Sequence, residues 1–152
     1  KSLKRIKTPI ILSSGGTSVE SLSKIIEILK ENTIALLQCT SIYPCPTEKV
    51  NLSVMDDFKK RFKVPVGFSS HHSSPILSAM ASAYGAQIVE VHVTLDRALW
   101  GTDQAMSIGP RGGEVLIRSI KQFELAKGEA SKVVYEEESK TLSRTVDNEN
   151  LN

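Results

Sequence analysis

Cysteine, tryptophan and long apolar stretches are all scarce in this chain, and each scarcity excludes a class of protein. The 152 residues include two cysteines and one tryptophan. Cys39 and Cys45 are too few for a disulfide scaffold or a four-cysteine zinc site, so we expect reduced thiols and a cytoplasmic protein. No apolar run approaches the roughly 20 residues of a membrane span, and no apolar segment follows the basic first residues as in a secretory signal. The sequence therefore predicts no membrane association.

An excess of charge of one sign is also lacking. The 19 basic and 17 acidic residues leave a formal net charge of +2. No block of Lys and Arg is interleaved with aromatic residues, so electrostatics give no support for nucleic-acid binding. The length is sufficient for one domain with a hydrophobic core. The first residue is Lys1 rather than Met, which predicts a processed product or a piece of a longer reading frame.

Short apolar runs alternate with amphipathic segments as far as residue 126. We expect strands at 9–13, 33–39, 64–69 and 86–93, and helices at about 19–32, 54–62, 75–84 and 113–126. Thr17 and Glu20 have the spacing of a capping box. The apolar face of the third helix is expected to consist of Ile76, Leu77, Met80, Ala81 and Tyr84. This alternation predicts parallel strands joined by right-handed crossovers, as in barrels and doubly wound sheets.

The composition changes after Gly128. Residues 129–152 are polar and charged, with no sustained apolar period. We interpret this tail as a linker or arm that is largely disordered in isolation.

The fourth expected strand has two chemically different faces. Because side chains alternate across a strand, one face carries the aliphatic residues at odd positions 89 to 95, and the other carries Glu90 and His92. A carboxylate and an imidazole are costly to bury without partners. We therefore expect them to line the interior of a barrel, near the active site at the strand's carboxyl end. The alternative is the solvated face of an antiparallel edge strand.

Polar residues also follow the third expected strand, in the run Ser69 to Ser74. His71 and His92 therefore fall near the carboxyl ends of neighbouring strands. Neutral imidazole is a common ligand of Mn²⁺, Fe²⁺ or Zn²⁺, so the pair predicts a metal site, with a purely structural role as the alternative. Residues 13–16 (SSGG) precede a helix and are a weaker candidate for a phosphate site, because glycine is also usual in tight turns.

Five motifs in sequence order resemble the N-acetylneuraminate (sialic acid) synthase family, which includes the legionaminate and pseudaminate synthases. They are residues 9–15 (PIILSSG), 39–44 (CTSIYP), 66–71 (VGFSSH), 85–96 (GAQIVEVHVTLD) and 100–104 (WGTDQ) with Ser107. The resemblance implies a (β/α)8 TIM barrel, of which residues 1–128 supply the last four β/α units, strands five to eight. Residues 129–152 would then be a polar linker.

The resemblance also implies an activity. The family's enzymes are transferases of nonulosonic acid biosynthesis that condense phosphoenolpyruvate with N-acetylmannosamine or a related N-acylated sugar. In the implied reaction C3 of phosphoenolpyruvate attacks the sugar aldehyde, water adds at C2, and phosphate leaves by C–O cleavage. The full-length enzyme is expected to be a homodimer.

The same resemblance implies roles for individual residues. His71 and His92 match the family's metal ligands, with Mn²⁺ expected and Mg²⁺ or Co²⁺ as alternatives. The residues that match contacts to phosphoenolpyruvate carry hydroxyl groups: Ser13, Ser41, Tyr43 and Ser69. Asp103 matches an acid that contacts the sugar near the metal, and Glu90 matches the acid beside the second histidine, where it would orient a ligand or substrate. We expect Glu90 and Asp103 to be the catalytic residues.

The chain departs from the family's pattern at several positions. Ser70 stands where the family often has Asp, His72 where it often has Thr, and Val91 where Lys is common, which indicates a divergent branch and leaves the acceptor sugar open. His72 is a competing metal ligand, although its side chain is expected to point away from that of His71. Within these 152 residues nothing matches the lysines and glutamate of strands one to four or the family's small antifreeze-like domain.

Four strand motifs in place of eight predict that this chain alone is inactive, and marginally stable unless it self-associates, because half a barrel exposes two sheet edges. Three alternatives stay open. One is a related phosphoenolpyruvate-dependent 3-deoxy-sugar acid synthase that acts on a phosphorylated sugar and uses additional basic residues. The others are a non-catalytic half-barrel fragment and a doubly wound binding domain with its ligand at a topological switch point.

Overall fold

Four parallel strands form one sheet in the computed structural model, which describes residues 8–149. They are β1 (Ile10–Ser13), β2 (Ile34–Cys39), β3 (Val66–Ser70) and β4 (Val89–Val91), and their order in the sheet is their order in the chain. Each strand pairs in parallel with the next one. A doubly wound sheet reverses its strand order at a switch point, whereas right-handed crossovers in constant order place successive helices on one face. The structure is therefore an α/β half-barrel, as predicted, and the doubly wound alternative is wrong.

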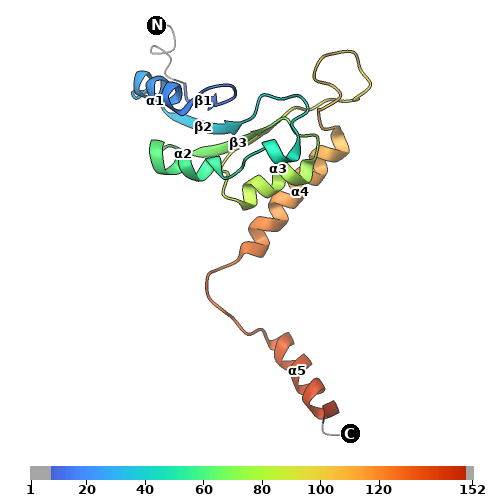
Figure 1. Cartoon of the computed structure of the whole chain (residues 1–152). Helices are drawn as coiled ribbons and strands as arrows, with labels where there is room; N and C mark the ends of the chain where they lie inside the picture. The colour runs from blue at the N-terminus through green and yellow to red at the C-terminus, as the bar shows by residue number, and fades with distance from the viewer. Residues whose placement is uncertain (1–7, 150–152) are drawn as a thin grey trace.

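Helices separate the strands and cover one face of the sheet (Figure 1). They are α1 (Val19–Ile28), α2 (Val54–Phe62), α3 (Pro75–Ala83) and α4 (Pro110–Lys127), with a short 3-10 helix, η2 (Thr47–Lys49), before α2. The hydroxyl of Ser18, rather than that of Thr17, caps α1 by accepting the N–H of Ser21 at 3.3 Å. None of the helices in residues 8–149 is long and apolar enough to cross a membrane.

β4 is shorter than the eight-residue strand that we predicted. It leaves the ladder with β3 after Val91, and Val93 instead forms a parallel bridge with Ile108, just before α4. The backbone N–H of Ile108 donates to the carbonyl of His92 at 2.9 Å. The N–H of Thr94 donates in turn to the carbonyl of Ile108 at 3.0 Å, so this pairing anchors the backbone directly after His92.

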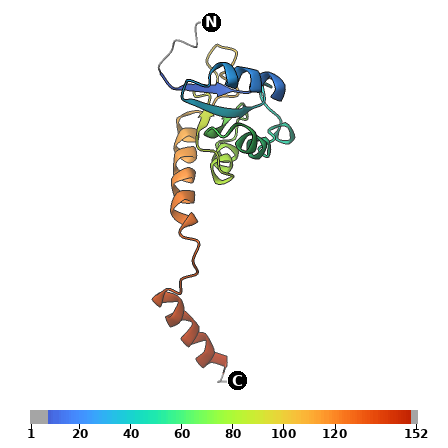
Figure 2. The same cartoon turned by 90° about the vertical axis from the view of Figure 1, so that its left-hand side faces the viewer.

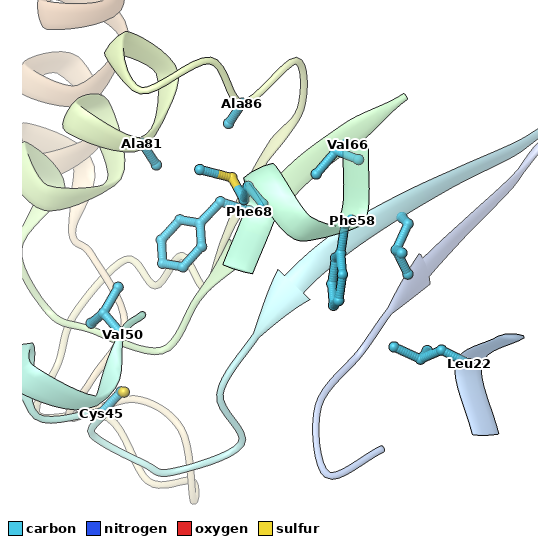
Figure 3. Packing of buried hydrophobic residues seen from close by; sticks show 10 residues of the cluster. Leu22, Cys45, Val50, Phe58, Val66, Phe68, Ala81 and Ala86 are labelled. Atoms are coloured by element: carbon cyan, nitrogen blue, oxygen red, sulfur yellow. The ribbon is translucent and has the colours of Figure 1, made fainter. Parts of the chain in front are cut away.

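The core lies between the sheet and the helices (Figure 3). Phe68 of β3, with 2% of its surface exposed, packs in one cluster with Leu22 of α1 and with Met55 and Phe58 of α2. The strand residues of this cluster all point to the helix side. The opposite side of the sheet carries apolar residues such as Leu37 together with the polar residues Ser69 and Glu90.

α3 buries only part of the predicted apolar face, because Ala81 lies in the core and Leu77 packs against it as predicted, whereas the rest of that face is exposed. Ile76 and Met80 remain 49% and 59% exposed, whereas Ser78, Ala79 and Ala81 are buried. α3 lies side by side with α4 (Figure 1). Small side chains such as that of Ala79 allow these two helices to approach closely. The contact with α4 therefore buries the small residues of α3 and leaves the larger Ile76 and Met80 exposed.

Residues beyond α4 stand apart from the layered unit (Figures 1 and 2). α4 ends at Lys127 and is capped by Gly128, which has a φ of 54°, and an extended stretch leads to α5 (Glu136–Glu149). The prediction of a tail without regular structure was wrong for α5. Three glutamates in its first turn complement the helix dipole, and Lys140 pairs with Glu136 at 2.6 Å, so local interactions support this helix.

Candidate functional site

The interior face of β3 and β4 carries the polar residues that the sequence singled out. Val89 and Val91 pack into the apolar clusters on the helix side, so Glu90 points the other way. Ser69 pairs with Glu90 in the register of the two strands, and its hydroxyl donates to Glu90 Oε1 at 2.7 Å. The predicted two-faced strand is confirmed. β4 runs parallel to β3 and not antiparallel, but it is the last strand of the sheet and Glu90 is exposed, so the alternative of an edge strand with a solvated face stays open.

His71 and His92 meet at the carboxyl ends of these strands. Their ring centroids are 5.2 Å apart and the ring planes differ by 60°. His71 is 7% exposed, and its Nδ1 lies 2.9 Å from the carbonyl oxygen of Thr40. A carbonyl can only accept, so Nδ1 carries the hydrogen and Nε2 keeps a free lone pair. Metal-binding histidines are commonly oriented by such a bond.

Two further side chains flank the histidines. The ring of Tyr43 lies against His71, with centroids 4.1 Å apart and planes tilted by 39°, and it meets His92 edge-on at 6.2 Å. Asp103 Oδ2 lies 3.7 Å from His92 Nδ1, which is too long for a hydrogen bond but places a carboxylate beside the imidazole. The Ser107 hydroxyl donates to the Asp103 carbonyl at 2.7 Å and so fixes the loop that carries this carboxylate.

The donor chemistry of the histidine pair fits a divalent metal. Two imidazoles that bind one ion through bonds of about 2.0–2.2 Å have centroids roughly 4.5–5.5 Å apart, and the observed separation of 5.2 Å falls in that range. Across residues 8–149, however, no set of three or more His, Cys, Asp or Glu side chains is arranged to hold a metal ion. The pair would therefore leave coordination positions to water or substrate oxygens.

The four predicted hydroxyl residues fall into two groups. Ser13 ends β1 and Ser41 follows β2, and both are exposed. A Cβ atom at Gly15 would collide with the Ser41 hydroxyl, so Ser41 lies against the turn after β1. Tyr43 and Ser69 belong to the second group, because Tyr43 contacts both histidines and Ser69, 3% exposed, is hydrogen-bonded to Glu90.

A buried network that the sequence analysis missed joins the ends of β1 and β2. The hydroxyl of Ser14 donates to Gln38 Oε1 at 3.4 Å and accepts the N–H of Cys39 at 3.1 Å. The amide of Gln38 donates in turn to the carbonyl of Val50 at 3.3 Å. The glutamine inside an otherwise apolar strand was the available signal. Ser14 is 5% exposed, so in this structure it ties strand ends together rather than lining a phosphate site.

Both cysteines are free and buried. Cys39 Sγ lies 3.8 Å from Nδ1 of His71, the nitrogen that already contacts Thr40. Burial raises the pKa of the Cys45 thiol above its usual value, and the nearby Cys39 adds to this effect. Cys45 is therefore a neutral packing residue rather than a thiolate ligand.

Comparisons with known proteins give a consistent result. Residues 1–132 match the model of the NeuB family. The N-acetylneuraminate-9-phosphate synthase of Homo sapiens is 36% identical over 127 residues, which are 82% of this chain and 35% of that protein. The N,N'-diacetyllegionaminic acid synthase of Campylobacter jejuni is 33% identical over 148 residues, which are 94% of this chain and 44% of that protein.

A solved structure agrees with these relatives. The N-acetylneuraminic acid (sialic acid) synthetase of Leptospira borgpetersenii, crystallised in complex with citrate, superposes with a TM-score of 0.76 at 29% identity. The match covers 88% of this chain and 48% of that one. The chain thus spans between about a third and a half of the length of the proteins that it matches.

Proposed function

The chain belongs to the NeuB family, and on that premise we propose that it supplies part of the active site of a nonulosonic acid synthase. The enzyme would be a transferase that condenses phosphoenolpyruvate with N-acetylmannosamine or a related N-acylated sugar and releases phosphate. The observation that carries this proposal is the pairing of His71 with His92, 5.2 Å apart at the carboxyl ends of adjacent parallel strands. Active sites of (β/α)8 barrels lie at this end of the strands. The relatives' roles as sialic and legionaminic acid synthases support carbohydrate biosynthesis.

In this proposal His71 and His92 hold a divalent metal, Mn²⁺ first and Mg²⁺ or Co²⁺ as alternatives. When bound, the metal would act as a Lewis acid toward the aldehyde oxygen of the sugar. The Thr40 carbonyl keeps the hydrogen of His71 on Nδ1, and this leaves the lone pair of Nε2 available to bind the metal. His92, 35% exposed, is the more accessible of the two histidines.

The remaining site residues bind and orient the two substrates. The hydroxyl groups of Ser13, Ser41 and Tyr43 would donate to oxygens of phosphoenolpyruvate. Ser69 would join them by turning its hydroxyl from Glu90 to the substrate. Glu90 accepts the Ser69 hydroxyl at one carboxylate oxygen, so its other oxygen is left to accept from a sugar hydroxyl. Asp103, 51% exposed beside His92, would accept from the sugar near the reacting aldehyde. Two free, buried cysteines support a cytoplasmic setting, and the homodimer expected of the full-length enzyme stays a prediction.

The test measures phosphate release from phosphoenolpyruvate by the complete gene product, with Mn²⁺ and either N-acetylmannosamine or its phosphorylated form. We expect His71→Ala and His92→Ala each to abolish metal-dependent release while the circular dichroism spectrum is unchanged. Gln87→Ala is the matched control, because Gln87 is exposed and precedes the opposite, amino end of β4.

The outcomes separate the proposals. Release that persists in both histidine variants would contradict the proposed site. Release with only the phosphorylated sugar would favour a synthase that acts on a phosphorylated acceptor. No release with either sugar, together with histidine variants that alter only folding, would favour the non-catalytic alternative.

A further inference from the structure

The third histidine, His72, has a different role from its neighbour. We infer that His72 is a positioning residue that ties the loop carrying Tyr43 to the loop carrying His71. The part of this inference that concerns metal and substrate binding rests on the proposed function. The link between the two loops rests on the structure alone.

Both ring nitrogens of His72 are engaged by protein groups. The backbone N–H of Ser74 donates to Nδ1 at 3.0 Å, and Nε2 lies 3.1 Å from the hydroxyl oxygen of Thr47. A backbone N–H can only donate, so Nδ1 must accept and the hydrogen of the neutral ring sits on Nε2. Nε2 therefore donates to Thr47. This arrangement leaves no nitrogen lone pair for a metal, so His72 does not compete with His71 as a ligand.

The hydrogen bond to Thr47 crosses between two loops. Thr47 begins η2, directly after the loop that carries Ser41 and Tyr43, whereas His72 follows His71 at the end of β3. The same two loops meet where the N–H of Cys45 donates to the carbonyl of His71 at 2.9 Å. The side-chain bond at Thr47 and the backbone bond at Cys45 thus fix the end of the Tyr43 loop on both sides of residue 46.

Tyr43 depends on this fixation because burial does little to hold it. Its side chain is 51% exposed, yet its ring lies 4.1 Å from that of His71. A half-exposed ring gains little from packing, so its place over the histidine follows from the position of its loop. Loss of the His72–Thr47 link leaves the Cys45–His71 backbone bond as the remaining tie between the two loops, so the contact between Tyr43 and His71 should weaken.

Two replacements of His72 separate its two hydrogen bonds. Asparagine can place an acceptor near the position of Nδ1, so His72→Asn keeps the bond from Ser74 but cannot reach Thr47. Glutamine can place an amide near the position of Nε2, so His72→Gln keeps the bridge. Thr47→Val removes the same bridge from the other side with little change in shape.

The experiment measures two quantities in the intact protein. The first is the nuclear Overhauser effect between the rings of Tyr43 and His71, and the second is the dissociation constant for Mn²⁺. We expect His72→Asn and Thr47→Val to weaken the ring contact and to bind Mn²⁺ about 3- to 10-fold more weakly, the effect of one neutral hydrogen bond. His72→Gln should retain both properties, and combining His72→Asn with Thr47→Val should add no further loss.

The inference is overturned if the ring contact is as strong as in the wild type in both His72→Asn and Thr47→Val, if His72→Gln loses it, or if the effects of the two single changes add. The ring contact needs no metal, so its loss and its rescue by glutamine support the link even if the wild-type protein does not bind Mn²⁺. Failure of the wild-type protein to bind Mn²⁺ would contradict the proposed function instead.

Discussion

Replacing Gly67 by alanine should destabilise the sheet beneath the histidine pair. Gly67 lies on the interior face of β3, two residues before Ser69. A Cβ atom there would collide with the carbonyl oxygen of Ile88 and would lie 2.6 Å from Leu37 Cδ2 and 2.9 Å from Ile88 Cβ. Neither neighbour can move freely, because Leu37 is fully buried and the Ile88 carbonyl accepts the N–H of Phe68 at 2.8 Å.

The magnitude follows from these two contacts. Overpacking a closely packed interior costs about 1–3 kcal/mol. Separating β3 from β4 would also weaken the hydrogen bond from Phe68 to Ile88, which contributes about 0.5–1.5 kcal/mol. We therefore expect Gly67→Ala to lower the free energy of unfolding by about 2–4 kcal/mol. For a chain of this length the melting temperature should fall by roughly 4–16 °C.

Gly113→Ala is the matched control, since the same substitution should have the opposite effect there. Gly113 lies inside α4, and no atom lies within 4 Å of a Cβ placed on it. Alanine is favoured over glycine in a helix by about 0.5–1 kcal/mol, so this variant should be more stable than the wild type. Urea unfolding followed by circular dichroism measures both changes. A Gly67→Ala protein within about 0.5 kcal/mol of the wild type would refute the reasoning.

Three further predictions concern single side chains. Ser69→Ala removes the donor to Glu90 and should lower the free energy of unfolding by about 0.5–1.5 kcal/mol in urea titrations, and an unchanged midpoint would contradict it. Phe68→Ala should cost about 3–5 kcal/mol in the same assay, whereas Met80→Ala, on the exposed face of α3, should stay within about 0.5 kcal/mol of the wild type. Burial raises the pKa of Cys45 in the folded state, so the protonated thiol is the form that folding favours. Its contribution is fully present below the usual thiol pKa of 9.0 and is lost as the pH rises through the raised value. The free energy of unfolding should therefore decrease above about pH 9, and an equal decrease in Cys45→Ala would contradict this account.

The sequence by itself determined the α/β class of the fold and the alternation of strands with helices. The alternation of apolar runs with amphipathic segments predicted parallel strands, and the strand-like alternation from Val89 to Val93 predicted which way Glu90 and His92 point. These inferences succeed because they depend on local periodicities of about 2 and 3.6 residues, which are properties of the sequence and need no contact between distant segments. The motifs also identified the family, and the carboxyl-end placement of His71 and His92 predicted that they would be neighbours.

Only the tertiary structure decided how those neighbours are arranged. Which nitrogen of His71 is free depends on the backbone carbonyl of Thr40, and a carbonyl has no signature in the sequence. The face that α3 buries depends on its contact with α4, where the space available favours Ala79 over Met80. The separate role of His72 depends on Thr47, 25 residues earlier in the chain. Such contacts arise from register and close packing between distant segments, so no local pattern specifies them.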